Sequence, residues 1–93
     1  MLQQTQRKYQ IDYDLRRPGQ NYSGLIERLQ QLGAVKVLLS TWVLRSAADA
    51  VTIRDDLKRF IDGNDSLLVT GLTGEAAWFN VAVGNTLKQY IAA

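Results

Sequence analysis

The sequence contains no cysteine and no histidine, and it has a single proline in 93 residues. Without cysteine the chain has no disulfide, no thiolate zinc site and no cysteine nucleophile. Without histidine it has no imidazole general base and no Ser-His-Asp triad. Any chemistry near pH 7 must therefore use a carboxylate, a hydroxyl, a lysine or a bound metal ion.

A large excess of one charge and a long apolar run are also missing. Eleven Lys and Arg stand against nine Asp and Glu, a net charge of +2, which is small for a protein that coats nucleic acid. No apolar run reaches the roughly 18 residues of a membrane span. The first ten residues lack the apolar core of a signal peptide. We expect a cytoplasmic protein with no membrane partner, in which residues 1–6 are either disordered or an extension and residues 7–93 are one domain.

Hydrophobic periodicity indicates the order of the elements. Residues 8–15 alternate as a strand with one buried face, carrying Tyr9, Ile11, Tyr13 and Leu15 on that face and Gln10, Asp12 and Asp14 on the other. An amphipathic helix is expected over 22–32. The Val- and Leu-rich stretch 34–45 is either one bent strand or a hairpin that turns at Leu39-Ser40. A capping box from Ser46 to Asp49 predicts a second helix, and residues 66–72 form a last strand.

This order predicts an α+β ferredoxin-like sandwich, with two helices on one face of an antiparallel sheet. The opposite face is expected to be bare, and a bare apolar face favours a homodimer. Residues 76–83 fit either a hairpin or a helix, and a short terminal helix is expected to run through Tyr90.

Asp12 and Asp14 form the candidate reaction centre. Aspartate is disfavoured inside strands, and two residues apart these carboxylates point to the same side, about 7 Å from each other. Hard oxygen ligands of this kind favour Mg²⁺, Mn²⁺ or Ca²⁺. The structural alternative is that each carboxylate caps the following turn or pairs with an arginine.

Four further residues are candidate binding groups. Arg16 and Arg17 precede a Pro-Gly turn and can clamp phosphates, although adjacent arginines on a loop also form an ordinary solvated edge. Trp42 can stack a nucleic-acid base, or it can serve as a core or interface anchor. Ser40 has no histidine base to activate it as a nucleophile.

Several of these stretches resemble small CRISPR-associated ferredoxin-like proteins, which act in spacer acquisition, some of them as metal-dependent endoribonucleases. The resemblance is carried by Tyr13-Asp14-Leu15, by Ser40-Thr41-Trp42 and by residues 64–69 (NDSLLV). Residues 13–22 (YDLRRPGQNY) are also similar to short stand-alone relatives called SinR-like, and VapD-type toxin ribonucleases are similar as well. The resemblance covers roughly residues 8–72.

The resemblance implies a homodimer whose metal-binding aspartate is Asp14, with Ser40 and Trp42 on the second strand's polar-x-aromatic pattern. The sequence departs from the family pattern in two places. Asp12 stands where the family usually has an apolar residue, and the segment after residue 72 does not match the family's last strand. Three functions stay open. They are a non-catalytic dimer that binds nucleic acid or protein, a Mg²⁺- or Mn²⁺-dependent endonuclease for RNA or DNA that uses Asp14 of both protomers, and an antitoxin-like or regulatory dimer without nucleic acid.

Overall fold

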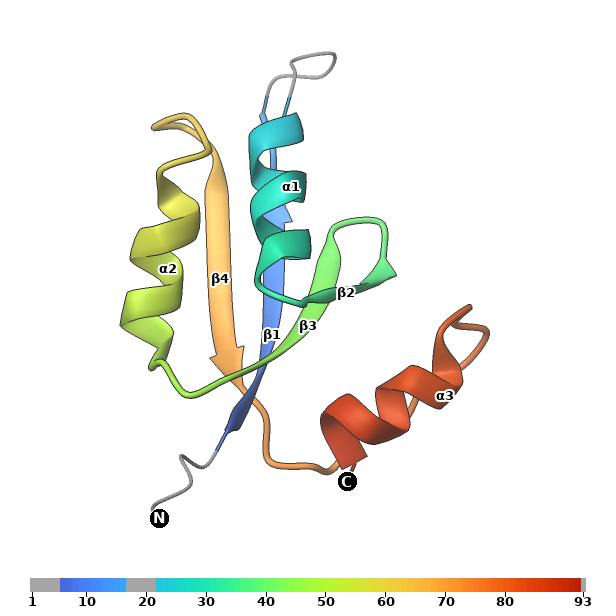
Figure 1. Cartoon of the computed structure of the whole chain (residues 1–93). Coiled ribbons are helices and arrows are strands. Elements are labelled where there is room, and N and C mark those ends of the chain that lie inside the picture. Colours follow the sequence, from blue (N-terminus) through green and yellow to red (C-terminus); the bar gives the residue numbers. More distant parts are fainter. Residues whose placement is uncertain (1–5, 17–21, 93) are drawn as a thin grey trace.

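The computed structural model describes residues 6–16 and 22–92. Four strands form one antiparallel sheet in the order β2-β3-β1-β4 (Figure 1). The strands are β1 (Arg7–Asp14), β2 (Val35–Leu38), β3 (Thr41–Ser46) and β4 (Ser66–Gly71). The helix α1 (Ser23–Gln31) links β1 to β2, and α2 (Ala50–Lys58) links β3 to β4. The result is a small α+β domain compatible with a ferredoxin-like fold.

The alternation of β1 separates the two faces of the sheet, as the sequence predicts. Tyr9 and Ile11 are 3% and 0% exposed and face the helices. We call their side the helix face, and the side that carries Gln10, Asp12 and Asp14 the second face. Because β1 lies between β3 and β4, its aspartates meet residues of both neighbouring strands.

The main core fills the space between the helix face and both helices. Each helix buries two residues of its apolar stripe, Leu25 and Leu29 from α1 and Ile53 and Leu57 from α2. Burial of side chains of this size stabilises the fold by roughly 1.5–3 kcal/mol each, so the helix stripes hold the helices on the sheet. The expectation of two helices on one face is confirmed.

The stretch 34–45 is a hairpin and not one bent strand. β2 and β3 pair antiparallel around a turn at Leu39 and Ser40. The pairing shifts register between Lys36 and Leu38, which makes β2 a short and irregular edge of the sheet.

The capping box expected to begin at Ser46 is wrong by one turn. Asp49 is itself the N-cap of α2, and its carboxylate accepts a hydrogen bond from the Thr52 amide over 2.8 Å. Hydrogen bonding from Thr52, first from its side chain and then from its amide, lowers the pKa of Asp49. Ser46 instead accepts a bond from the Ala48 amide, 3.1 Å away, and shapes the turn before the helix.

The C-terminal segment corrects the expectation of a bare second face. Residues 75–83 form neither a strand nor a helix, and α3 (Gly84–Leu87) then continues as a π-helical turn, η1 (Lys88–Ala92). Leu87 and Ile91 of this segment pack on Val43 of β3, and all three are at most 7% exposed. The chain thus covers the β2–β3 half of the second face itself, whereas Leu68 of β4 stays 60% exposed.

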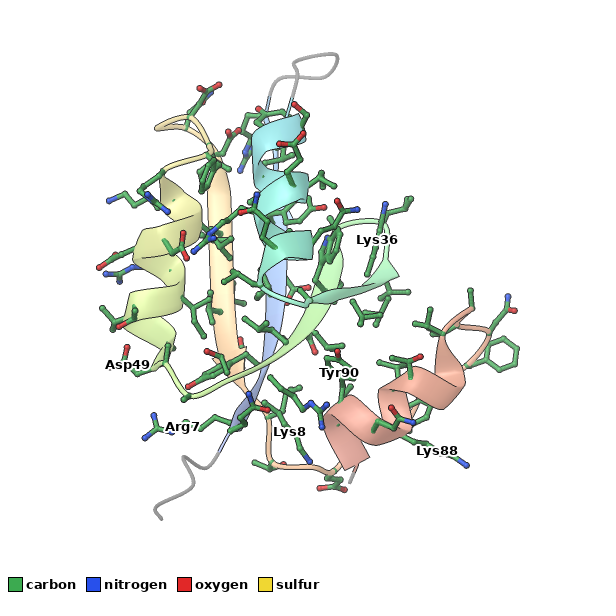
Figure 2. All side chains as sticks on the ribbon, viewed as in Figure 1. Arg7, Lys8, Lys36, Asp49, Lys88 and Tyr90 are labelled. Atoms are coloured by element: carbon green, nitrogen blue, oxygen red, sulfur yellow. The ribbon has the colours of Figure 1, made fainter. Side chains whose placement is uncertain are left out.

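Two cations of the sheet hold this segment in place. The Lys8 ammonium donates to the carbonyl of Ile91 over 3.5 Å. The Arg45 guanidinium lies 4.8 Å from the ring centre of Tyr90, a cation–π contact. Figure 2 shows Arg7 and Lys8 at the start of β1, at the end of the sheet that the C-terminal helix approaches.

Candidate functional site

Asp12 lies on the second face, where the sequence places it, and the sheet occupies both of its oxygens. The Thr41 hydroxyl donates to Oδ1 over 2.6 Å from the facing position on β3. The side-chain amide of Gln10 donates to Oδ2 over 3.0 Å. The half-buried carboxylate is therefore held by hydrogen bonds from two neutral groups.

Asp14 stands at the end of β1 on the same face and is exposed. Its carboxylate lies 3.7 Å from the Arg16 guanidinium, with the two side chains 69% and 58% exposed. An ion pair so open to water contributes little to stability. A depression of about 220 Å³ runs beside the two aspartates and is shaped by Tyr13, Ser66, Leu67 and Leu68.

Asp65 organises the loops beside Asp14 and is not among the site residues predicted from the sequence. Its Oδ1 accepts from the Arg16 amide over 2.8 Å and from the Tyr22 hydroxyl over 3.1 Å. Its Oδ2 accepts from the Asp62 amide over 2.8 Å. Asp65 thereby ties the end of β1 to the start of α1 and to the loop before β4. The signal in the sequence is its Asp-Gly-Asn-Asp context, which favours side-chain bonds to backbone amides.

The other predicted binding residues do not gather around Asp14. Trp42 is 3% exposed in the main core, and its indole donates to the Tyr13 hydroxyl over 3.0 Å, so a base has no access to its ring. Ser40 lies in the turn between β2 and β3, where its carbonyl accepts from the Tyr13 amide over 3.2 Å. Arg17 lies outside the described residues.

The donor set of one protomer does not fit a divalent cation. Within residues 6–16 and 22–92 no group of three or more acidic side chains is close enough to hold a metal ion. Both Asp12 oxygens already accept hydrogen bonds, and Asp14 has a guanidinium beside it. An Mg²⁺ or Mn²⁺ ion at Asp14 would need carboxylates from a second copy.

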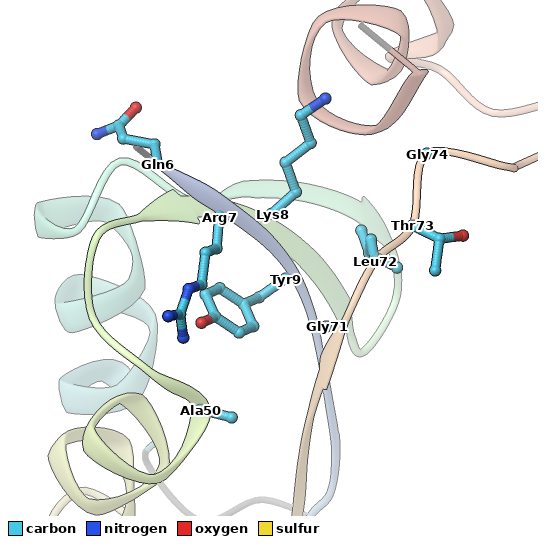
Figure 3. A pocket seen from close by; sticks show the side chains of 9 residues that line it. All are labelled: Gln6, Arg7, Lys8, Tyr9, Ala50, Gly71, Leu72, Thr73 and Gly74. Atoms are coloured by element: carbon cyan, nitrogen blue, oxygen red, sulfur yellow. The ribbon is translucent and has the colours of Figure 1, made fainter. Parts of the chain in front are cut away.

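A larger depression lies at the opposite end of β1. It measures about 590 Å³ and is bordered by Arg7, Lys8, Ala50 and residues 71–74 (Figure 3). Figure 3 shows Arg7 and Lys8 pointing to opposite sides of the strand. β1 thus begins with two basic side chains, Arg7 and Lys8, and carries two acidic side chains, Asp12 and Asp14, towards its end.

Comparison with known proteins informs the fold alone. No family model matches the chain. The chain is similar to the crystal structure of a hypothetical protein, TT1823, from Thermus thermophilus, with a TM-score of 0.64 and 23% identity over 82% of this chain and 93% of that chain. None of the helices in the described part of the chain is long and apolar enough to cross a membrane. The chain shares its small α+β architecture with the Thermus protein.

Proposed function

We propose that the protein is a non-catalytic dimeric interaction module whose two copies pair through β4. The observation that carries this proposal is the open edge of β4. We also infer a ferredoxin-like fold, which the β-α-β-β-α-β order and the strand order β2-β3-β1-β4 support.

The two edges of the sheet differ in their protection against pairing. β2 is four residues long, carries Lys36 and is interrupted by a register shift. β4 has six residues (SLLVTG) with no charge and no proline, and it pairs with β1 without interruption. Soluble proteins usually blunt an exposed edge with charges, proline or bulges. β4 has none of these devices, so it is the edge suited to another strand.

The backbone of β4 presents alternate residues outward. Leu72 donates its amide to the Lys8 carbonyl over 2.9 Å, which makes Leu72 and Lys8 a hydrogen-bonded pair. In an antiparallel ladder every second residue bonds the same neighbour, so Leu67, Val69 and Gly71 direct their N–H and C=O groups away from β1. When β4 of a second copy pairs antiparallel with it, centred on Val69, the outward N–H and C=O groups of these three residues find hydrogen-bond partners in both copies.

Apolar side chains flank this edge on both sides. Leu68 is 60% exposed on the second face, and Val51 of α2 is 54% exposed on the helix side. A depression of about 220 Å³ between α2 and β4 is lined by Ala50, Val51, Arg54 and residues 67–69. Pairing of two copies removes this apolar surface from water, which favours the dimer.

The charge of β1 agrees with a two-fold arrangement. Strand pairing about Val69 sets Lys8 of one copy level with Asp14 of the partner subunit, and Asp14 level with the partner's Lys8. The basic start of each β1 is therefore level with the acidic end of the other, three strand spacings of about 4.8 Å away. This pairing sets no like charges of the two β1 strands at the same level.

The same arrangement separates the two Asp14 carboxylates. Three strand spacings of about 4.8 Å and six residues of about 3.3 Å place them more than about 20 Å apart. This separation is far beyond one metal shell, whose oxygen ligands lie about 2–2.6 Å from the ion. The proposed dimer therefore cannot hold one metal ion between its two Asp14 carboxylates. The endonuclease alternative requires a face-to-face dimer that brings both Asp14 residues together.

The test is the mass of the protein in solution, measured by light scattering across a concentration series. The wild type should approach twice the 10.4 kDa chain mass. Val69→Pro removes an outward N–H and keeps the ladder to β1, and Leu68→Lys adds a charge at the edge; both should give monomers. Leu39→Lys is the matched control, because Leu39 is 89% exposed in the β2–β3 turn. A monomeric wild type, or folded edge variants that remain dimers, would refute the proposal.

A further inference from the structure

A further cavity lies between the second face of the sheet and the C-terminal segment, away from the β4 edge and from Asp14. It measures about 310 Å³, within the size of small-molecule sites. Its walls are mainly apolar and come from both layers, with Val37 and Val43 from the sheet and Trp78, Leu87 and Ile91 from the segment. Apolar walls of this extent suit the body of a small organic ligand.

Three polar side chains of the lining, Gln10, Thr41 and Glu75, offer hydrogen-bond acceptors. Thr41 gives its hydroxyl hydrogen to Asp12, so only lone pairs of that oxygen remain. Gln10 uses one amide hydrogen on Asp12 and keeps its carbonyl oxygen as an acceptor and its second amide hydrogen as a donor. Glu75 adds an exposed carboxylate that forms no ion pair within the described part of the chain.

The nearby cations are engaged outside the cavity. Lys8 donates to the Ile91 carbonyl, and Arg45 stacks on Tyr90. Neither of them lines the cavity. Glu75 is therefore the one charged side chain among the described lining residues, and Asp12 lies behind Gln10 and Thr41.

We propose that this cavity binds a small organic cation with a primary ammonium group on an apolar body. The ammonium donates to the acceptors of Gln10, Thr41 and Glu75, and the apolar body packs between the valines of the sheet and Trp78. An ammonium ion leaves water only where acceptors and negative charge replace its hydration, and these three residues supply both. A carboxylate of the same length meets the like charge of Glu75, so it should bind less tightly than the ammonium.

Trp78 reports directly on the cavity. A Cβ added at Gly84 would stand 3.1 Å from the Trp78 indole nitrogen, so the indole rests against the glycine backbone. Trp42, the other tryptophan, lies in the main core on the opposite face. The two indole N–H signals in a nitrogen-resolved NMR spectrum therefore give a reporter and an internal control in the same protein.

The experiment titrates the full chain with octylammonium and, separately, with octanoate. Octylammonium should move the Trp78 signal saturably, leave the Trp42 signal in place and bind at least about tenfold more tightly than octanoate. Ala77→Leu, which places a larger side chain in the lining, should abolish the response, and Ala47→Leu at an exposed position outside the lining should preserve it.

Three outcomes would overturn the proposal: equal affinity for octylammonium and octanoate, movement of both tryptophan signals together, or no movement at millimolar octylammonium. Glu75→Gln gives a second reading, because it should reduce the preference for octylammonium without unfolding an exposed position. The cavity and the outer edge of β4 share no residue, so a monomeric Val69→Pro variant should still bind octylammonium.

Discussion

Thr41 and Asp12 face each other on β3 and β1, and the Thr41 hydroxyl donates to the Asp12 carboxylate over 2.6 Å. This bond makes Asp12 part of the sheet rather than a free metal ligand. It also leaves the Thr41 hydroxyl with acceptor lone pairs alone, so this oxygen can accept a hydrogen bond from a ligand in the adjacent cavity.

Thr41→Val should lower the free energy of unfolding by about 1–2 kcal/mol, because a half-buried carboxylate loses a charge-assisted hydrogen bond. Urea unfolding followed by circular dichroism measures the change. Thr73→Val, at an exposed position outside the strands, is the control and should change stability little. Equal stability of Thr41→Val and wild type would show that Asp12 does not depend on Thr41.

Asp65→Ala should release the backbone of Arg16. The Arg16 amide loses its acceptor at 2.8 Å and should exchange with deuterium at a rate near that of an unprotected amide. Asp65→Asn keeps an acceptor oxygen and should retain part of the protection. Site-resolved hydrogen exchange distinguishes the variants, and unchanged protection of Arg16 in Asp65→Ala would contradict the role assigned to Asp65.

Asp56 links the two helices and should control part of the stability in acid. Hydrogen bonds from Arg28 of α1 are the main cause of its lowered pKa, and Arg59 adds to them at 2.6 Å. Because the folded pKa is below the unfolded value, the contribution is complete above the ordinary pKa near 3.8 and is lost as the pH falls through the folded pKa.

Unfolding curves measured between pH 2 and 7 test this role. The variant Asp56→Asn should be less stable at neutral pH by about 1–2 kcal/mol and should lose less stability on acidification than the wild type. Asp55→Asn is the matched control on the same helix, since that carboxylate is exposed and pairs with its neighbour Arg54. An identical acid dependence in Asp56→Asn and wild type would rule out the link.

Neither the wild type nor Asp14→Ala should cleave single-stranded RNA or DNA in a reaction that depends on Mg²⁺ or Mn²⁺. The reason is that the proposed dimer holds no metal ion between its Asp14 carboxylates. Cleavage by the wild type that EDTA and Asp14→Ala both abolish would establish the endonuclease alternative instead.

The elements whose apolar residues recur with a clear period were predicted from the sequence. The alternation around Tyr9 and Ile11 placed β1 and its two faces correctly, and the stripes of both helices identified the main core. The first helix was expected over 22–32, and Gly33, the next residue, has a φ of +82°, the left-handed conformation that glycine accepts most readily. These features depend on local spacing, which a single sequence records.

The remaining features depend on contacts between distant residues. The partners of Asp12 follow from the register of β1 and β3, which is fixed only once the hairpin turn at Leu39 and Ser40 is known. Trp42 is buried by the same register, since it faces Ile11 on the helix face. Residues 76–83 are apolar without a period, so their place over the second face follows from packing around Val43 and not from a local pattern.

Hydrogen exchange at the outer edge of β4 tests the proposed dimer most directly. We expect the amides of Leu67, Val69 and Gly71 to become protected as protein concentration rises, and Leu68→Lys to remove this protection while the amides of β1 stay protected. Rapid exchange of these three amides at concentrations where the protein is a dimer would contradict pairing through β4.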